Sequence, residues 1–301
     1  MDLQIKGIIP PMLTPLDSMA DIDEEGVRSL VAHLLGSGIH GLFILGTNGE
    51  APGLSYRLRK EFISLTCGLV NKRVPVLVGI TDTSFEGSLE IANHSKEAGA
   101  DAVVVAPPYY MPITQKEMQA YLENLSRELP LPFLLYNMPS HTKLHLAIET
   151  VKRAKELGAL GIKDSSGDML YLYSILDEFK DSPEFSIITG TELFMPELIM
   201  NGGHGAIAGG ANIFPGLFVD LYNAAKQKDF EKVAVLRQSV MKLYKTIYNV
   251  GDSPAKTIIG IKCALSVLGI CNDYMAPPLT RFSASERKKI EMYLGEIKEL
   301  L

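Results

Sequence analysis

Hydrophobic residues in this chain gather in short runs, and the segments between the runs have helical spacing of apolar and polar positions. Eight runs rich in β-branched residues are predicted strands: 5–10, 41–45, 74–79, 101–106, 132–137, 159–163, 185–189 and 205–209. Several of them do not alternate with polar residues, which is typical of parallel strands covered on both faces. The pattern therefore predicts a repeated strand–helix unit.

The segments between the runs carry recognisable helix starts. Asp23 precedes one amphipathic segment, and Ser55 opens another. Capping boxes are predicted at Thr83 and at Thr114, because a glutamate follows each of them three residues later. Spacers of this size suit right-handed crossovers between parallel strands.

Eight units in about 225 residues fit a (β/α)8 TIM barrel better than an open doubly wound sheet. No linker divides the chain, and no GxGxxG motif follows the first run. We assign residues 1–228 to the barrel. Residues 229–301 hold three helical segments (230–248, 254–269 and 284–300) without a strand, starting at Ser253-Pro254 and at a capping box from Ser283. We predict a C-terminal helical appendage packed on the barrel.

Composition narrows the functional classes. The net charge is −6, and no block of lysine and arginine is interleaved with aromatic residues, so nucleic acid is not an expected partner. The first apolar stretch is too short for a signal peptide or a membrane span, so we expect a cytoplasmic protein without a membrane partner. The three cysteines, Cys67, Cys263 and Cys271, lack CxxC spacing and are expected to be buried thiols.

In TIM barrels the chemistry lies on the loops that follow the carboxyl ends of the strands. In this chain those loops carry hydroxyl groups, two tyrosines and a lysine, in the segments 46–50, 81–82, 107–110, 136–142, 163, 190–192 and 209–215. They are expected to converge on one rim and to form a concave site with few polar groups.

Lys163 ends the sixth run, where apolar surroundings would lower its pKa. A free amine can attack a ketone and form a Schiff base, whose iminium is an electron sink. Tyr136, at the end of the fifth run, is the candidate general acid/base for the proton transfers. The structural alternatives are a solvated Lys163 paired with Asp164, and a Tyr136 hydroxyl bonded to a carbonyl.

The loop GTNGE (46–50) adds further candidates. Thr47 could link Tyr136 to Tyr110 by hydrogen bonds, and the amides of Thr47 and Asn48 could hold a carboxylate. A plain tight turn is the alternative interpretation.

Together these motifs resemble the Schiff-base (class I) aldolases of the dihydrodipicolinate synthase and N-acetylneuraminate lyase superfamily. The similar segments cover nearly the whole chain: GIIPPMLTP, GTNGE, PPYY, YNMP, GIKDSSGD and GGHGAIAGGANIFP. The resemblance implies a (β/α)8 barrel, a homotetramer built from tight dimers, and binding or release of pyruvate without a metal or an organic cofactor.

By motif position, Lys163 would form the imine and Tyr136 would be the general acid/base. The resemblance also implies that Thr47 and Tyr110 complete a proton relay, which Tyr110 would join across a dimer interface. Thr47 and Asn48 would bind the pyruvyl carboxylate. Gly190 and Ile207 would line the pocket through their backbones.

Departures from the lysine-biosynthetic synthases bear on the substrate. His141 stands where those enzymes have an arginine that clamps the carboxylate of the aldehyde substrate, and Asn48 replaces a threonine. The segments TNGE and KDSSGD are most similar to members acting on 4-hydroxy-2-oxoglutarate or 2-keto-3-deoxy sugar acids. We predict a pyruvate-dependent carbon–carbon lyase for such an acid. The synthase reaction, with aspartate semialdehyde, and N-acetylneuraminate cleavage are the alternatives.

Two further positions follow from the resemblance. Glu192 would contact a polyol as in the neuraminate lyases, or it is a helix N-terminal glutamate favoured by the dipole. The positions that align with the lysine-feedback site of the synthases hold Tyr56, Arg59 and Gly87, so feedback by lysine is not expected.

Three other functional classes fit the sequence less well. A metal enzyme is disfavoured because only His141 and His145 are closely spaced among the histidines. The glycine-rich eighth unit resembles a phosphate cradle, but no lysine or arginine lies between Lys180 and Lys226 to neutralise a phosphate. A non-catalytic 2-oxo acid sensor is disfavoured because Lys163 and Tyr136 are retained.

Overall fold

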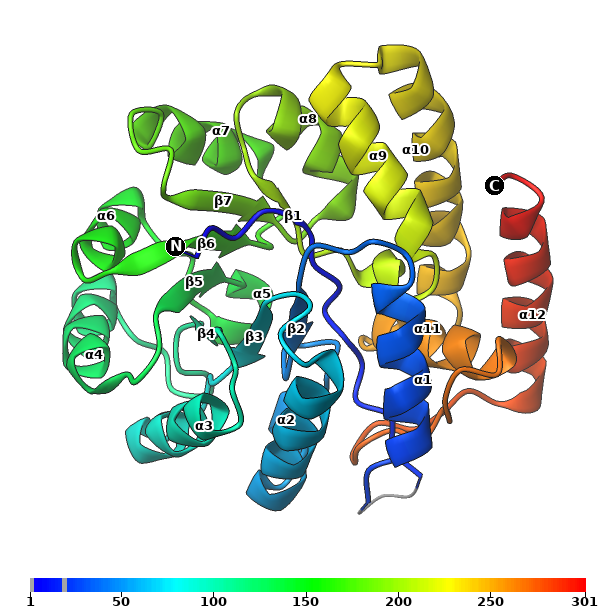
Figure 1. Cartoon of the computed structure of the whole chain (residues 1–301), viewed down its shortest axis with the longest axis horizontal. Coiled ribbons are helices and arrows are strands. Elements are labelled where there is room, and N and C mark those ends of the chain that lie inside the picture. Colours follow the sequence, from blue (N-terminus) through cyan, green and yellow to red (C-terminus); the bar gives the residue numbers. More distant parts are fainter. Residues whose placement is uncertain (1–2, 18–20) are drawn as a thin grey trace.

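The computed structural model describes residues 3–17 and 21–301. Within them eight parallel strands form one sheet in the order β1-β8-β7-β6-β5-β4-β3-β2 (Figure 1). The strands are β1 (Gly7–Ile8), β2 (Leu42–Ile44), β3 (Val76–Gly79), β4 (Ala102–Val105), β5 (Phe133–Asn137), β6 (Ala159–Asp164), β7 (Ser186–Thr189) and β8 (Gly205–Ala206). Each falls at a predicted run, so all eight predicted strands are confirmed.

Backbone hydrogen bonds close the sheet into a barrel. Past the end of β1, Met12 N–H donates to Phe43 O (2.8 Å), and Phe43 N–H donates to Pro10 O (3.0 Å). Pro11 and Phe43 form a parallel bridge there. The first and last strands of the order are thus joined, and the fold is the predicted (β/α)8 TIM barrel.

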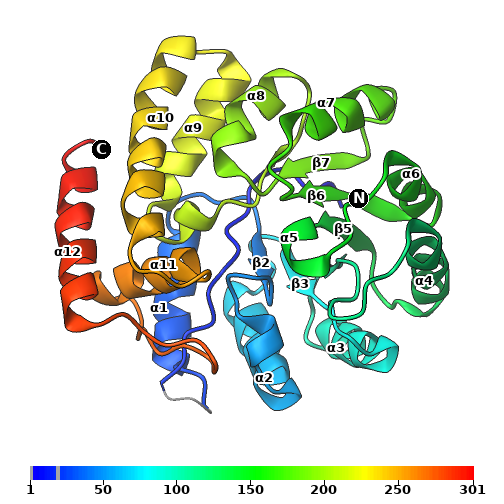
Figure 2. The same ribbon diagram turned by 180° about the vertical axis from the view of Figure 1, so that it is seen from behind.

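Helices surround the barrel: α1 (Glu24–Leu35), α2 (Tyr56–Val70), α3 (Phe85–Glu97), α4 (Gln115–Glu128), α5 (Pro139–Thr142), α6 (Ile148–Glu156), α7 (Met169–Glu178), α8 (Met195–Met200) and α9 (Pro215–Gln227). Three more, α10 (Phe230–Lys245), α11 (Lys256–Val267) and α12 (Ala284–Lys298), are called the C-terminal helices below. They gather on one side of the barrel, with α12 at the outer edge (Figures 1 and 2). The division of the chain at residues 228 and 229 stays a prediction.

The strands bury two separate apolar layers. Phe43, Leu77, Leu134 and Ile188 belong to a small cluster inside the barrel, whereas their strand neighbours pack in the large cluster beneath the helices. This alternation follows from the two-residue period of a strand. Tyr136 belongs to the inner cluster, and therefore points into the barrel.

Local signals placed most helix starts correctly. Asp23 and Ser55 cap their helices, and the capping boxes from Thr114 and Ser283 are present. The box from Thr83 is wrong by one residue, because Ser84 is the N-cap of α3 and accepts from Gly87 N. The predicted start at Ser253-Pro254 is also early, since α11 begins at Lys256.

Candidate active site

Tyr136 and Lys163 lie side by side at the carboxyl ends of β5 and β6. They are direct partners in the strand register. Lys163 Nζ is 4.0 Å from the ring centroid of Tyr136 and 4.9 Å from that of Phe43. Both residues are buried. Within the described part of the chain Lys163 has no carboxylate within 4.0 Å, so it is not the solvated Asp164 pair of the structural alternative.

Burial controls the protonation of this pair. It lowers the pKa of Lys163 below the ordinary lysine value, although Tyr136 and Asp164 act in the opposite direction. Burial alone would raise the pKa of Tyr136, but the charge of Lys163 and the hydroxyls of Thr47 and Ser165 together lower it. Burial thus favours the uncharged amine, whereas a charged amine favours loss of the Tyr136 proton, so the two groups are placed to exchange a proton.

The loop after β2 brings Thr47 and Asn48 to the same place. Thr47 Oγ1 lies 3.5 Å from Tyr136 Oη, a long contact. Among the described groups, neither Thr47 N–H nor Asn48 N–H finds a hydrogen-bond acceptor, while Glu50 N–H bonds to Thr47 O. Two adjacent free amides on a cavity wall are suited to an anion.

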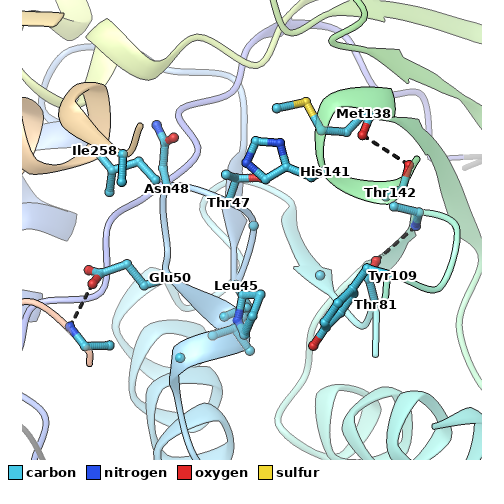
Figure 3. A pocket seen from close by; sticks show the side chains of 18 of the residues that line it. Leu45, Thr47, Asn48, Glu50, Thr81, Tyr109, Met138, His141, Thr142 and Ile258 are labelled. Atoms are coloured by element: carbon cyan, nitrogen blue, oxygen red, sulfur yellow. Dashed lines mark hydrogen bonds between the residues drawn. The ribbon is translucent and has the colours of Figure 1, made fainter. Parts of the chain in front are cut away.

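Two adjoining cavities open at this rim. The inner cavity has a volume of about 260 Å³ and is lined by Lys163, Ser165, Gly190, Glu192 and Ile207. The outer cavity has about 840 Å³ and includes Tyr109 and His141 (Figure 3). Both volumes are bounded by the same five residues: Thr47, Asn48, Tyr136, Met138 and Thr257. Tyr136 therefore stands where the cavities meet, and Lys163 lies beside it in the inner cavity.

Gly190 and Ile207 line the inner cavity, as the resemblance implied. Their amides are committed to the barrel, with Gly190 N–H on Asp164 O (2.6 Å) and Ile207 N–H on Thr189 O (2.9 Å). A Cβ at Gly190 would lie 1.9 Å from Ser165 Oγ and 3.1 Å from Lys163 Cε. Only glycine leaves room for the lysine here.

Glu192 is a buried member of the inner cavity. Its Oε1 accepts from Tyr248 Oη at 2.6 Å, and its Oε2 accepts from Gly210 N at 2.9 Å. Burial raises its pKa from 4.5 to about 7, against the effect of these hydrogen bonds. It also opens a 3₁₀ turn, Glu192–Phe194, which agrees with a glutamate at a helix N-terminus, while contact with a polyol stays a prediction.

The structure does not bring Tyr110 to Lys163 within one chain. Its side chain is 86% exposed, and its φ of 82° is rare for a residue with a side chain. It lines neither cavity. The preceding Tyr109 lines the outer cavity instead, opposite Glu50 in Figure 3.

His141 lies on α5 at the wall of the outer cavity (Figure 3). Its Nδ1 is 2.9 Å from Ser140 Oγ. Burial, and then the charge of Lys143, lowers the pKa of His141. The imidazole is therefore neutral near pH 7 and cannot replace an arginine as a partner of a carboxylate.

Sequence reasoning missed the residues that the C-terminal part of the chain contributes. Tyr244, Tyr248 and Thr257 line the inner cavity, although they follow the start of the eighth strand at Gly205 by 39 to 52 residues. No local motif marks them, because they reach the rim only through packing of the C-terminal helices. Ser165 was within the quoted motif KDSSGD but had no predicted role.

Other features of the described residues limit the class of site. No cluster of three metal-binding side chains occurs among residues 3–17 and 21–301. In the same ranges no helix has the length and apolar character to cross a membrane. At the lysine-feedback positions, Tyr56 Oη and Arg59 Nη1 both donate to Asp82 Oδ2, at 3.0 and 2.8 Å.

Comparisons with known proteins agree with this geometry. The model of the dihydrodipicolinate synthetase family matches residues 4–297. The 4-hydroxy-tetrahydrodipicolinate synthase of Methanopyrus kandleri is 32% identical over 303 residues, which is 100% of this chain and 98% of that protein. A protein of Escherichia coli K12 described as a probable 2-dehydro-3-deoxy-D-pentonate aldolase is 30% identical over 295 residues, with 97% of each chain covered.

Solved structures share the whole fold. The dihydrodipicolinate synthase of Bacteroides thetaiotaomicron matches with a TM-score of 0.95 and 47% identity, covering 98% of this chain and all of that one. YagE of E. coli K12, solved in complex with pyruvate, matches with a TM-score of 0.92 and 29% identity over 98% and 99% of the two chains. With a family match over almost its full length, and relatives named as synthase and aldolase, this chain belongs to the dihydrodipicolinate synthetase family, which consists of class I aldolase-type lyases.

Proposed function

We propose that this protein is a Schiff-base-forming lyase in which Lys163 carries a pyruvyl imine. The observation that supports this most is a buried amine that lines the inner cavity, 4.0 Å from the ring centroid of Tyr136, which borders both cavities. A lysine with a lowered pKa supplies the free amine that attack on a ketone requires. Its placement on a strand fixes the nitrogen better than a loop would.

The first half of the reaction forms the imine. Lys163 Nζ attacks C2 of the 2-oxo acid, the nitrogen then loses a proton and the carbonyl oxygen accepts one, which gives a neutral carbinolamine. The hydroxyl then leaves as water after a second protonation, and the nitrogen lone pair forms the iminium. Tyr136 is the group beside Nζ that donates and recovers these protons, with Thr47 as the next hydroxyl of the relay.

The second half cleaves the carbon–carbon bond of a 4-hydroxy-2-oxo acid. A base removes the proton of the C4 hydroxyl, the C3–C4 bond breaks, and its electron pair moves into the iminium to form an enamine. An aldehyde leaves. The enamine takes a proton at C3, and water releases pyruvate from Lys163. We assign the base to Tyr136, because it is the titratable neighbour of the lysine.

The loop Gly46 to Glu50 is proposed to bind the carboxylate of the same substrate. Free amides at Thr47 and Asn48 point to this role, because a carboxylate accepts from two adjacent donors. Asn48 lies beside the inner cavity in contact range of Gly209, where a Cβ would be 3.1 Å from Asn48 Nδ2. Gly190 and Ile207 would form the opposite wall through their backbones.

For the second half of the substrate we favour the uncharged tail of a 2-keto-3-deoxy sugar acid or a 4-hydroxy-2-oxo acid. His141 offers no fixed positive charge to an aldehyde carboxylate. Glu192 offers a buried acceptor that suits hydroxyl groups. The relatives named as synthases favour the other candidate, condensation of pyruvate with aspartate semialdehyde.

The oligomeric state and the cellular compartment are also proposals. We propose a homotetramer of tight dimers, in which Tyr110 completes the site of a second copy. Support comes from Tyr110 and Met111, two adjacent large side chains that are exposed in the single chain (Met111 to 68%). Their exposure does not stabilise one chain alone, and a second copy could cover them. We propose that the protein acts in the cytoplasm, and that the imine itself replaces any metal or organic cofactor as the electron sink.

Borohydride trapping tests the central step. With pyruvate, borohydride should inactivate the protein and add the mass of a reduced pyruvyl group to Lys163, and EDTA should have no effect. Loss of activity in EDTA without an adduct would favour a metal enzyme. An adduct without turnover of any substrate would favour a 2-oxo acid sensor.

A substrate panel then separates the candidates. 4-Hydroxy-2-oxo acids, 2-keto-3-deoxy sugar acids and sialic acid are tested through pyruvate release, and pyruvate with aspartate semialdehyde is tested for condensation. Efficient condensation with no cleavage of the panel would replace our preferred substrate class by the synthase reaction.

A further inference from the structure

Glu50 ends the proposed carboxylate loop, and its side chain is buried against the C-terminal helices. Oε1 accepts from Lys262 Nζ at 2.5 Å, and Oε2 accepts from Ala276 N at 2.8 Å (Figure 3 shows the second bond). The side-chain exposure is 2% for Glu50 and 0% for Lys262. Glu50 thus forms one ion pair and one further hydrogen bond with residues more than 200 positions away in the sequence.

The loop needs external support because its backbone is unfavourable at both ends. Leu45 has a φ of 55° and Glu50 has a φ of 56°, both in the left-handed region that residues with side chains avoid. Thr14 Oγ1 adds one anchor by donating to Gly49 O at 2.7 Å. Such a conformation persists only where its surroundings determine it.

The ion pair also sets the charge beside the proposed anion site. Glu50 borders the outer cavity, two residues from Asn48, whereas Lys262 borders neither cavity. Paired with Lys262, the carboxylate is neutralised and does not repel an incoming carboxylate. Without the lysine, the same group would be an uncompensated buried charge close to the substrate.

We propose that Lys262 is a positioning residue for the proposed carboxylate loop, acting through Glu50. It would hold the amides of Thr47 and Asn48 toward the inner cavity and keep this region neutral. The inference rests on the proposed function, because it concerns how the 2-oxo acid is bound. It gives Lys262 a part in substrate binding without contact to the substrate.

Saturation of borohydride trapping by pyruvate provides the test. Lys262→Met should raise the half-saturating pyruvate concentration by about tenfold and leave the maximal trapping rate within about twofold, as expected when only binding is lost. Glu50→Gln keeps the shape of the side chain and should also raise the half-saturating pyruvate concentration. This variant provides the test if Lys262→Met does not fold.

A double variant and a control at another buried ion pair complete the experiment. Glu50→Gln combined with Lys262→Met removes both charges and should bind pyruvate better than Lys262→Met alone. Arg59→Met breaks a second buried ion pair, that of Arg59 with Asp82, and should lower stability without changing the half-saturating pyruvate concentration. Unchanged half-saturation in folded Lys262→Met or Glu50→Gln overturns this inference. No adduct in the unmodified protein overturns the proposed function, and this inference with it.

Discussion

Asn137 donates a 2.7 Å hydrogen bond from Nδ2 to Asp164 Oδ1, and the two residues are paired in the register of β5 and β6. The pair directly follows Tyr136 and Lys163, which are paired one step earlier. Because side chains alternate across a strand, the amide–carboxyl bond lies on the opposite side of the barrel wall from the reactive pair. It therefore fixes the alignment of the two strand ends.

Breaking that bond should affect both stability and turnover. Asn137→Ala leaves the buried Asp164 with one partner fewer and frees Leu146 N, which now donates to Asn137 Oδ1 at 3.0 Å. We expect a loss of about 2 kcal/mol in the free energy of unfolding and a lower kcat. Urea denaturation and steady-state kinetics measure the two effects. A stable, fully active variant would show that β5 and β6 align without this bond.

Tyr136→Phe should slow turnover by about 100-fold, the usual effect of losing a general acid/base. The ring, its packing on Phe43 and its contact with Lys163 are kept, so the fold should be preserved. Tyr171→Phe is the matched control, because its buried hydroxyl donates to Leu146 O outside both cavities. Near-normal turnover of Tyr136→Phe would remove that hydroxyl from the mechanism.

Lys163→Met should stabilise the protein while abolishing the adduct. The pKa of Lys163 is lowered in the fold, so its contribution to stability is full above the ordinary value of 10.5 and is lost as the pH falls below it. At pH 7 the lysine thus opposes folding, and methionine should add about 1 kcal/mol to the free energy of unfolding. The gain should shrink toward pH 10. Lys152→Met, at an exposed ion pair, should give no such gain.

Glu192→Gln should change the pH dependence of stability. Burial raises the pKa of Glu192 from 4.5 to about 7, so its contribution is full below 4.5 and is lost as the pH rises through about 7. The unmodified protein should therefore lose more Tm between pH 5 and pH 8 than the variant does. Glu128→Gln, on the exposed side of α4, is the control. Equal pH profiles would show that the carboxyl stays ionised throughout.

L-Lysine at millimolar concentration should not inhibit this protein. Tyr56 and Arg59 occupy the feedback positions with their polar groups on Asp82, and the guanidinium would repel the lysine ammonium. A Cβ at Gly87 would lie 2.4 Å from Tyr56 Oη, so a glutamate does not fit there. Inhibition assays with and without lysine measure this. Clear inhibition would require another binding site.

Much of the barrel was predictable because its signals are local. Each strand is a continuous apolar run, and Lys163 was placed at a strand end by its neighbours alone. The pairing of Tyr136 with Lys163 follows once the parallel order is assumed. These features depend on residues that are close in sequence, or on a repeating unit that occurs eight times.

What the sequence did not reveal depends on long-range packing and on backbone conformation. Lys262 reaches Glu50 and Tyr248 reaches Glu192 only after the C-terminal helices have docked, and no spacing rule links such distant positions. Tyr110 lies outside both cavities and has a φ of 82°, and a pattern of residue types shows neither feature. The one-residue error at α3 arose because Thr83 and Ser84 are both good capping residues.

The two cavities would divide bond chemistry from the selection of the second substrate. The covalent chemistry proposed for Lys163 concerns the inner cavity and the residues at its mouth, while His141 and Tyr109 border the outer cavity alone. Substitutions in the outer wall can therefore alter the preferred aldehyde and leave the reactive amine unchanged. A few substitutions in the outer wall would then be enough to change the substrate, and α5 is a suitable segment for directed evolution.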